Sequence, residues 1–304
     1  MEWRNQKLPF QSALGRLLAI LLVAGLLASQ GCAPTLTDEQ QQAQQRWLKW
    51  RQDNNAAATD PERSFLNIRD AVYLDLGQQV WLDSRVNASQ IGWQLANENT
   101  DLALTHQGEH AQVLWYHSQL QLRDQQSLDL NPQLFISVGE LYQGKMRAFI
   151  RDRRHPLLAD FQGFEFYPYN PQARVSANFT ATEPAAVKLQ TVQGLVNQFY
   201  RVGLVNFTWQ GQQLTMPVYH SQAQPPFDHL LLLFRDQTNG DTTYGGGREL
   251  VLKLNQGLQP RVTIDFNYAV NFYCARSTFW NCPVLRDPPL TVAIDAGEQY
   301  RSVY

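Results

Sequence analysis

The residues with the clearest capacity for chemistry follow an apolar run from Leu230 to Phe234. Such a run is typical of a strand buried on both faces, and it ends just before Asp236, so a carboxylate stands at the mouth of a buried element. Further along, three consecutive glycines precede Arg248, and a glycine backbone can approach another group closely. The Arg248 guanidinium is a rigid fork that fits a carboxylate or a phosphate.

A second polar pair, Asp265 and Asn267, alternates with the apolar residues Val262, Ile264 and Phe266. In a strand, the period of two places both polar side chains on one face. We therefore predict that two acids, an amide and an arginine converge in one cleft. The candidate ligand-binding residues are Asp236, Tyr244, Gly245, Gly246, Gly247, Arg248, Asp265, Asn267 and Asn271.

Three interpretations of this cluster stay open. It can be a structural turn in which Arg248 pairs with Asp236 or Asp265. It can bind a polar or anionic small ligand or an envelope partner, and binding is the interpretation favoured over catalysis. It can also belong to a hydrolase, with Asp236 or Asp265 as general base and Arg248 stabilising negative charge. No nucleophile elbow, P-loop or dinucleotide fingerprint supports a known catalytic class, so catalytic residues are left unassigned.

Two other strings resemble metal sites. Residues 106–110 read His-Gln-Gly-Glu-His, the spacing of an inverzincin, but that chemistry needs a helix, and the central glycine between alternating segments predicts a hairpin tip. Residues 236–241 resemble a calcium loop, yet the glycine comes one position early and no glutamate stands at the twelfth position. We predict no metal and no cofactor.

The elements that must position these residues are mainly strands. From Ala71 onward hydrophobic residues recur with a period of two, and strand-turn-strand units bracket Gln107-Gly108, Gln143-Gly144 and Gln210-Gly211. The fold class is therefore mainly β, an antiparallel sandwich or barrel with one N-terminal helix.

The helix is predicted from Thr37 to Asp53. Thr37 and Gln40 have the spacing of a capping box, and Trp47 and Trp50 lie at helical spacing, as expected of a stripe that docks on the main body. The polar stretch from Asn54 to Pro61 is expected to end it.

The first residues read as an export signal. A basic start precedes an uncharged run from Leu17 to Ala28, which is too short to span a membrane comfortably. The string Ala-Ser-Gln-Gly-Cys at 28–32 resembles a bacterial lipobox, which predicts lipidation of Cys32; an ordinary signal peptide with an incidental cysteine is the alternative. The expected organisation is a signal peptide at 1–31, an acylated N-terminus with helix and linker at 32–61, and a β-rich domain at 62–304.

Charge and the residue after Cys32 bear on location and partners. The formal net charge is −2, so a nucleic-acid partner is not expected. By resemblance to the lipoprotein sorting rule, Ala33 in place of aspartate favours the outer membrane. We expect a chain in the bacterial cell envelope, lipid-anchored to the membrane and facing the periplasm, with a small-molecule ligand. Its oligomeric state is left open.

The chain has three cysteines, and acylation of Cys32 leaves Cys274 and Cys282 as an even pair in an oxidising compartment. A disulfide between them is expected. A thiolate metal site is the alternative, although no Cys-x-x-Cys motif or nearby histidine accompanies the pair.

Several of these residues also form a pattern. It comprises Phe234, Asp236, Thr238 and Gly240, the string at 243–248, Asp265-Phe266-Asn267, Asn271, Cys274-Ala275, Cys282-Pro283 and Ala296-Gly297-Glu298, with a second block between Arg151 and Val175. In order and spacing it resembles the bacterial and archaeal family called domain of unknown function 1684. The resemblance implies that the segment from Asp236 to Cys282 is the family signature, and it implies no activity. Glu249 stands where that family commonly has an aromatic residue.

Overall fold

The computed structural model describes residues 36–254 and 257–300. Of the described residues, those within Gln44–Tyr304 belong to one compact unit. The first residues of the N-terminal helix, up to Ala43, belong to a second unit. Fifteen strands in the described residues form three sheets, and every pairing between named strands is antiparallel. The predicted mainly β class with a helix near the N-terminus is confirmed.

Two four-stranded sheets share one hydrophobic core. The first has the order β1-β8-β7-β6 and the second the order β2-β3-β4-β5. Their inward side chains, among them Leu104, Ile136 and Ile150, are buried together, so this part is a sandwich. The strands are β1 (Ile68–Leu74), β2 (Gln79–Leu82), β3 (Leu102–His106), β4 (Ala111–Trp115), β5 (Ser118–Leu122), β6 (Ser127–Asp129), β7 (Leu134–Leu141) and β8 (Lys145–Asp152).

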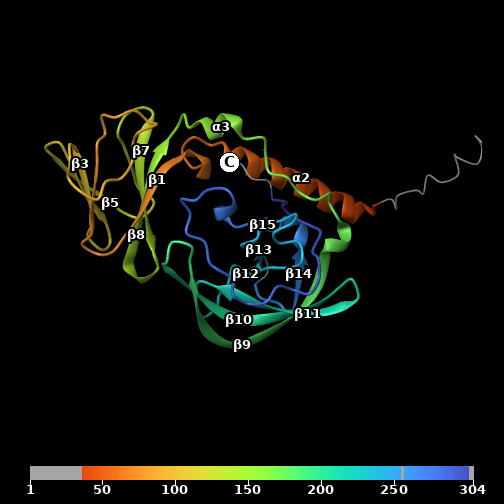
Figure 1. The fold of residues 1–304 in the computed structure, drawn as a ribbon. Coiled ribbons are helices and arrows are strands. Elements are labelled where there is room, and N and C mark those ends of the chain that lie inside the picture. The colour runs from red at the N-terminus through yellow and green to blue at the C-terminus, as the bar shows by residue number, and fades with distance from the viewer. Residues whose placement is uncertain (1–35, 255–256, 301–304) are drawn as a thin grey trace, which may run out of the picture. The chain divides into compact units, whose positions relative to one another are not determined.

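The third sheet has seven strands in the order β14-β9-β10-β11-β12-β13-β15. Its edge strands β14 and β15 are joined by a single short 3-10 helix, so the sheet curls until its edges approach, yet it does not close. Figure 1 shows its green to blue strands curving around the C-terminal segments. The strands are β9 (Arg174–Gln190), β10 (Val196–Trp209), β11 (Gln212–His220), β12 (His229–Phe234), β13 (Arg248–Lys253), β14 (Arg261–Asp265) and β15 (Val270–Asn271).

The predicted hairpins are confirmed. β3 pairs with β4 around Gly108, β7 with β8 around Gly144, and β10 with β11 around Gly211. Each of these glycines has a positive φ, the conformation a tight hairpin turn requires. In the last hairpin the alternating residues Val205, Phe207, Trp209, Leu214, Met216 and Val218 are all buried in the core of the curled sheet.

The N-terminal helix, α2 (Asp38–Ala58), begins with the predicted capping box: the Thr37 N–H donates to Gln40 Oε1 at 2.9 Å, and the Gln40 N–H donates to Thr37 Oγ1 at 3.3 Å. The predicted end at Asp53 is wrong, because the helix continues to Ala58. Three alanines at 56–58 favour helix, and the side chain of Asn55 accepts a hydrogen bond from the Phe164 N–H at 3.0 Å, so this polar stretch is held in place.

Trp47 and Trp50 dock α2 as expected. The Trp47 indole donates to the Asn267 carbonyl at 2.8 Å, and Trp50 packs edge-on against Phe166 and Tyr268. The remaining helices are single turns: η1 (Phe65–Asn67), η2 (Tyr142–Gly144), α3 (Pro156–Asp160), η3 (Pro171–Ala173), η4 (Phe266–Tyr268) and η5 (Tyr273–Ala275).

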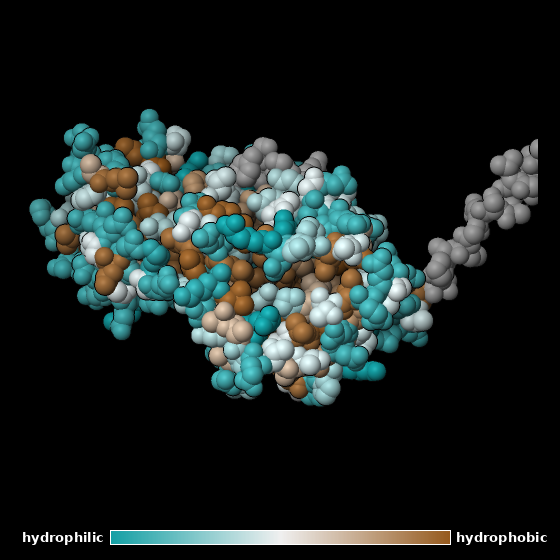
Figure 2. Space-filling view, turned by 60° about the horizontal axis from the view of Figure 1, so that its bottom comes forward, coloured by the Kyte–Doolittle hydropathy of each residue, from teal (hydrophilic) through white to brown (hydrophobic). Residues whose placement is uncertain are grey.

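The signal peptide and Cys32 lie outside the described residues. Within 36–254 and 257–300, no helix combines the length and the apolar character needed to cross a bilayer. Figure 2 shows one face of the surface, on which hydrophobic side chains (brown) gather in patches among hydrophilic ones (teal).

Candidate functional site

Arg248 and Asp236 form a buried ion pair. Arg248 is the first residue of β13, and Asp236 follows β12, its hydrogen-bonded neighbour. A terminal nitrogen of Arg248 donates to Asp236 Oδ2, and both side chains are 0% exposed. The guanidinium also donates to the carbonyls of Ala296 at 2.7 Å and Ile294 at 3.0 Å. The Arg248 guanidinium is therefore bound by groups of the protein itself, as expected if the cluster is a structural turn.

The other oxygen of Asp236 holds the turn after β12. It accepts hydrogen bonds from the Thr238 N–H at 2.7 Å and from the Thr238 hydroxyl at 2.6 Å. Asn239 closes the same turn, because its side chain accepts from the Asp236 N–H at 2.6 Å and donates to the Tyr244 carbonyl at 2.5 Å. Residues 236–241 therefore form a hydrogen-bonded turn whose first carboxylate is already paired with an arginine, an arrangement unlike a calcium loop.

The glycines serve close packing. A Cβ on Gly246 would lie 2.4 Å from the Tyr244 ring, and a Cβ on Gly247 would lie 2.9 Å from Leu285. Gly247 also has a φ of 120°, which side chains rarely adopt. Tyr244, Gly245 and Gly246 line a cavity of about 240 Å³ beside the Cys274–Cys282 disulfide, whereas Arg248 does not line it.

Asp265 and Asn267 form a second group. The predicted strand ends at Asp265, so the expectation of a shared strand face is wrong. Asp265 instead caps η4, accepting from the Asn267 N–H at 3.1 Å and from its side-chain amide at 2.8 Å. The Asn267 side chain also accepts a hydrogen bond from the Asn170 N–H and donates one to the Asn170 carbonyl. The Asn267 carbonyl accepts the hydrogen bond from the Trp47 indole. Burial raises the pKa of Asp265. This group fastens α2 to the curled sheet.

Asn271, the last residue of β15, contacts Tyr244 and Glu298. Its side chain accepts from the Tyr244 N–H at 3.0 Å, and its own N–H donates to Glu298 Oε2 at 2.8 Å. Glu298 forms a buried ion pair with Arg276, whose pKa burial lowers to about 10. The predicted residues thus separate into Tyr244, Asp236, Arg248 and Asn271 on one side and Asp265 with Asn267 on the other. Ligand binding by these residues stays a prediction.

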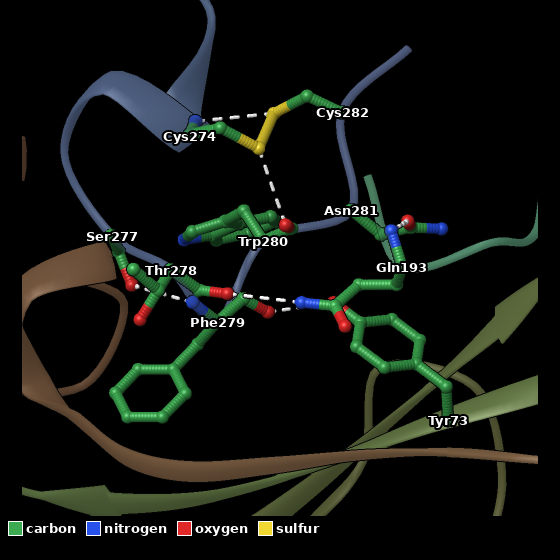
Figure 3. The surroundings of a disulfide bond; sticks show 9 residues. All are labelled: Tyr73, Gln193, Cys274, Ser277, Thr278, Phe279, Trp280, Asn281 and Cys282. Atoms are coloured by element: carbon green, nitrogen blue, oxygen red, sulfur yellow. Dashed lines mark hydrogen bonds between the residues drawn. A yellow bond between two sulfur atoms is a disulfide. The ribbon is translucent and has the colours of Figure 1, made fainter. Parts of the chain in front are cut away.

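Cys274 and Cys282 are joined in a disulfide, as expected, with their Cα atoms 6.1 Å apart. Figure 3 shows the loop between them. Gln193 holds this loop from outside by donating to the Thr278 carbonyl at 3.1 Å, and Tyr73 donates to the Phe279 carbonyl at 2.6 Å. The anchored loop presents Trp280, whose ring stacks on Tyr273 at 4.9 Å between centroids.

The zinc-like string at 106–110 is the hairpin tip between β3 and β4. A different cluster, His220, Asp228 and His229, brings three ligand atoms within 4.8 Å of one another. The Gln222 N–H donates to His220 Nδ1 at 2.9 Å, so neutral His220 carries its proton on Nε2, the nitrogen that faces Asp228 at 3.4 Å. His229 Nδ1 lies 2.7 Å from the same Asp228 carboxylate, so the three residues form a hydrogen-bonded group.

The aromatic cavity, as we name it here, is a hollow of about 290 Å³ between α2, the segment around Phe164 and the edge of the curled sheet at β13 and β15. The helix α2 contributes Trp50, Asn54 and Ala57 to its lining, and their spacing places them on one face of the helix. Six aromatic side chains line it: Trp50, Phe65, Phe164, Phe166, Tyr273 and Trp280. These rings also pack on one another, for example Phe65 on Phe164 at 6.0 Å and on Tyr273 at 5.8 Å, so the wall is preformed.

Two residues that line the aromatic cavity have unused hydrogen-bonding capacity. Glu249 of β13 is half-buried, and among the described residues no group hydrogen-bonds or ion-pairs with its carboxylate. Burial raises the pKa of this carboxyl group. The buried indole Nε1 of Trp280 likewise has no acceptor in the described part of the chain. Arg63, an exposed residue, lines the same cavity.

Glu249 was not among the site residues predicted from the sequence. In sequence it follows Arg248 as an ordinary strand glutamate, and its surroundings come from α2, residue 164 and residue 280, which only the fold brings together. Two signals were its place beside the signature arginine and its replacement of the aromatic residue common in the family it resembles.

Comparison with known proteins gives a family and no function. The model of the family described as "protein of unknown function (DUF1684)" matches residues 159–299, and the chain belongs to this family. An uncharacterised protein of Haloarcula marismortui, solved in solution by NMR, is 31% identical; the match covers 46% of this chain and 78% of that one, with a TM-score of 0.40. No curated protein matches the chain.

Proposed function

We propose that this member of the DUF1684 family is an envelope lipoprotein that binds a polar small ligand in the aromatic cavity. The observation that carries the proposal is the unpaired carboxylate of Glu249 inside a cavity that six aromatic side chains line. Small-molecule sites are typically concave and apolar with a few polar groups that fix orientation. A hollow of about 290 Å³ suits a small molecule rather than a protein segment.

Unmet hydrogen-bonding capacity supports a polar occupant. A buried polar group that lacks a partner costs roughly 1–3 kcal/mol, so such groups are uncommon in folded proteins without a reason. Here the unmet acceptor is Glu249, which lines the cavity and whose carboxylate has no partner among the described residues. A ligand that carries a hydrogen-bond donor satisfies it.

The proposed location in the cell envelope is supported by the N-terminal segment. A short apolar segment followed by a lipobox-like string favours acylation of Cys32, and two or more acyl chains anchor a protein firmly. The disulfide supports an oxidising compartment outside the cytoplasm. Replacing Cys32 with Ser is expected to release the mature chain from membranes or leave an unprocessed precursor. A fully processed Cys32→Ser chain that still sediments with membranes would exclude the lipid anchor.

A hydrolase is the second candidate, because burial raises the pKa of two carboxyl groups, those of Asp265 and Glu249, toward the range suited to proton transfer. The role of Arg248 in stabilising negative charge on a substrate, which the sequence suggested, gains little support. Arg248 is fully buried and donates to Asp236 and to two carbonyls, so it is not placed to meet a substrate.

The binding proposal is tested by filling the cavity. Ala57 lines it, whereas the neighbouring Ala56 does not, and both are exposed on α2. The purified full-length chain is screened against small polar compounds by thermal shift; a ligand at 100 times its Kd adds about 2.7 kcal/mol. We expect Ala57→Trp to abolish the shifts and Ala56→Trp to preserve them. Equal shifts in both variants would place binding elsewhere.

A further inference from the structure

We infer that the ligand of the aromatic cavity carries an ammonium group, primary or quaternary, which lies against the Glu249 carboxylate with its apolar body between the aromatic rings. This inference rests on the proposed function and narrows it to a chemical class.

The first argument is the charge balance of the cavity wall. Two carboxylates line the cavity, Glu249 and Glu298. Glu298 is already matched, since it ion-pairs with Arg276 and accepts the Asn271 N–H at 2.8 Å. Glu249 has neither an ion pair nor a hydrogen bond within the described residues. Arg63 lines the cavity too, but among the described residues it forms no ion pair with Glu249. An ionised carboxylate taken out of water is costly unless it is paired, and a ligand cation can supply the partner that Glu249 lacks.

The second argument is that two arginine guanidiniums of the chain already lie against aromatic rings of the cavity. The Arg276 guanidinium lies 4.8 Å from the centre of the Phe164 ring, and the Arg51 guanidinium lies 4.8 Å from that of Phe166. Both rings line the aromatic cavity. Ring faces attract cations within about 6 Å, and quaternary ammonium ligands are typically held by such aromatic walls. Trp50, Phe65 and Tyr273 line the same cavity, and within the described residues no guanidinium lies over them, so their faces can receive a ligand cation.

The third argument concerns orientation. Arg63 is exposed, whereas Glu249 is half-buried, so the arginine lies on the solvent side of the same cavity. Its positive charge repels an ammonium group from that side and favours the approach in which the ammonium faces Glu249. An anionic ligand would meet Glu249 inside the cavity, and two like charges in a poorly solvated site repel strongly.

The test uses three probes of one shape: phenethylamine, phenethyl alcohol and 3-phenylpropionate. Each is titrated into the full-length chain at millimolar concentration and near neutral pH, and binding is followed by NMR chemical shifts. We expect the amine to bind at least about tenfold more tightly than the alcohol. The carboxylate should bind most weakly. Glu249→Gln keeps the shape and removes the charge, so it should bring the amine and the alcohol to equal affinity.

Two further variants separate the possible failures. Glu183→Gln makes the same chemical change at an exposed position of β9 outside the cavity and should leave the preference for the amine intact. Ala57→Trp should weaken all three probes. If amine and alcohol bind wild type equally but Ala57→Trp abolishes both, the cavity function stands and the cation inference is overturned. If no probe binds, or Ala57→Trp changes nothing, the cavity function itself is overturned.

Discussion

Arg248 and Asp236 meet as an ion pair from which solvent is excluded, with both side chains 0% exposed. Their positions explain why the two residues belong to one signature. β12 and β13 pair antiparallel, with Phe234 opposite Arg248, so a residue just after β12 lies next to the start of β13. The Arg248 guanidinium also contacts the Phe234 ring at 5.0 Å. The pair therefore ties the turn after β12 to the C-terminal carbonyls of Ile294 and Ala296.

The first prediction concerns this pair. Arg248→Ala should lower the free energy of unfolding by about 3–5 kcal/mol, because it leaves the Asp236 carboxylate buried without its partner. Chemical denaturation with urea measures the loss. Arg63→Ala, at an exposed arginine outside the pair, should cost less than about 0.5 kcal/mol. A comparably small loss for Arg248→Ala would contradict the structural role of the pair.

The second prediction uses two neighbouring glycines. Gly247→Ala should destabilise the fold by about 1–3 kcal/mol, because its φ of 120° strains any side chain and the added Cβ would lie 2.9 Å from Leu285 and 3.1 Å from the Phe234 carbonyl. Gly245→Ala is the matched control, since its nearest neighbour would be an ordinary 3.7 Å away. Thermal melts of both variants should separate them clearly; similar melting temperatures would exclude a packing requirement at Gly247.

Much of the fold was predictable because it depends on local signals. Turn glycines such as Gly108 and Gly211 and alternating residues such as Val205 and Phe207 identify hairpins without knowledge of the rest of the chain. The capping pair Thr37 and Gln40 fixed the helix start in the same way. The helix end was not predictable, because it depends on a contact between Asn55 and Phe164, which are far apart in sequence.

The site was less predictable for the same reason. The ion pair of Asp236 and Arg248 follows from adjacent elements, and the sequence indicated it. Asp265 and Asn267 do contact each other, but through a 3-10 cap rather than a strand face, because β14 ends at Asp265, two residues before Asn267. The setting of Glu249 combines α2, Phe164 and Trp280, and no local pattern contains that combination.

The third prediction concerns the disulfide. Replacing Cys274 and Cys282 together with alanine should lower stability by about 2.5 kcal/mol in the chain-entropy model for a loop of this length. The loop is also held by Gln193 and Tyr73, so its fold should persist in part. Intact-mass analysis of the native chain under non-reducing conditions should find neither cysteine open to alkylation. Two alkylatable thiols, or stoichiometric zinc, would show that the pair is not a disulfide.

The last prediction follows from the raised pKa of Glu249. Its carboxyl group titrates higher in the folded chain than in the unfolded one, whose ordinary value is 4.5, because burial disfavours the charged form. Below that unfolded value both states are protonated and the group contributes nothing. As the pH rises through the unfolded and then the folded pKa, the unfolded state loses its proton more readily, so wild type loses stability.

Glu249→Gln has no such titration. Its melting temperature should therefore exceed that of wild type at neutral pH, and the difference should shrink toward zero as the pH falls below the unfolded pKa of Glu249. Glu183→Gln, at an exposed glutamate, should show no difference that varies with pH in this way. An ammonium ligand should reverse the order at neutral pH, since only the wild-type carboxylate gains a partner from it. A Glu249→Gln chain that is less stable than wild type at neutral pH without ligand would mean that Glu249 already has a partner in solution, and the aromatic cavity would then have no charge left for a cation to match.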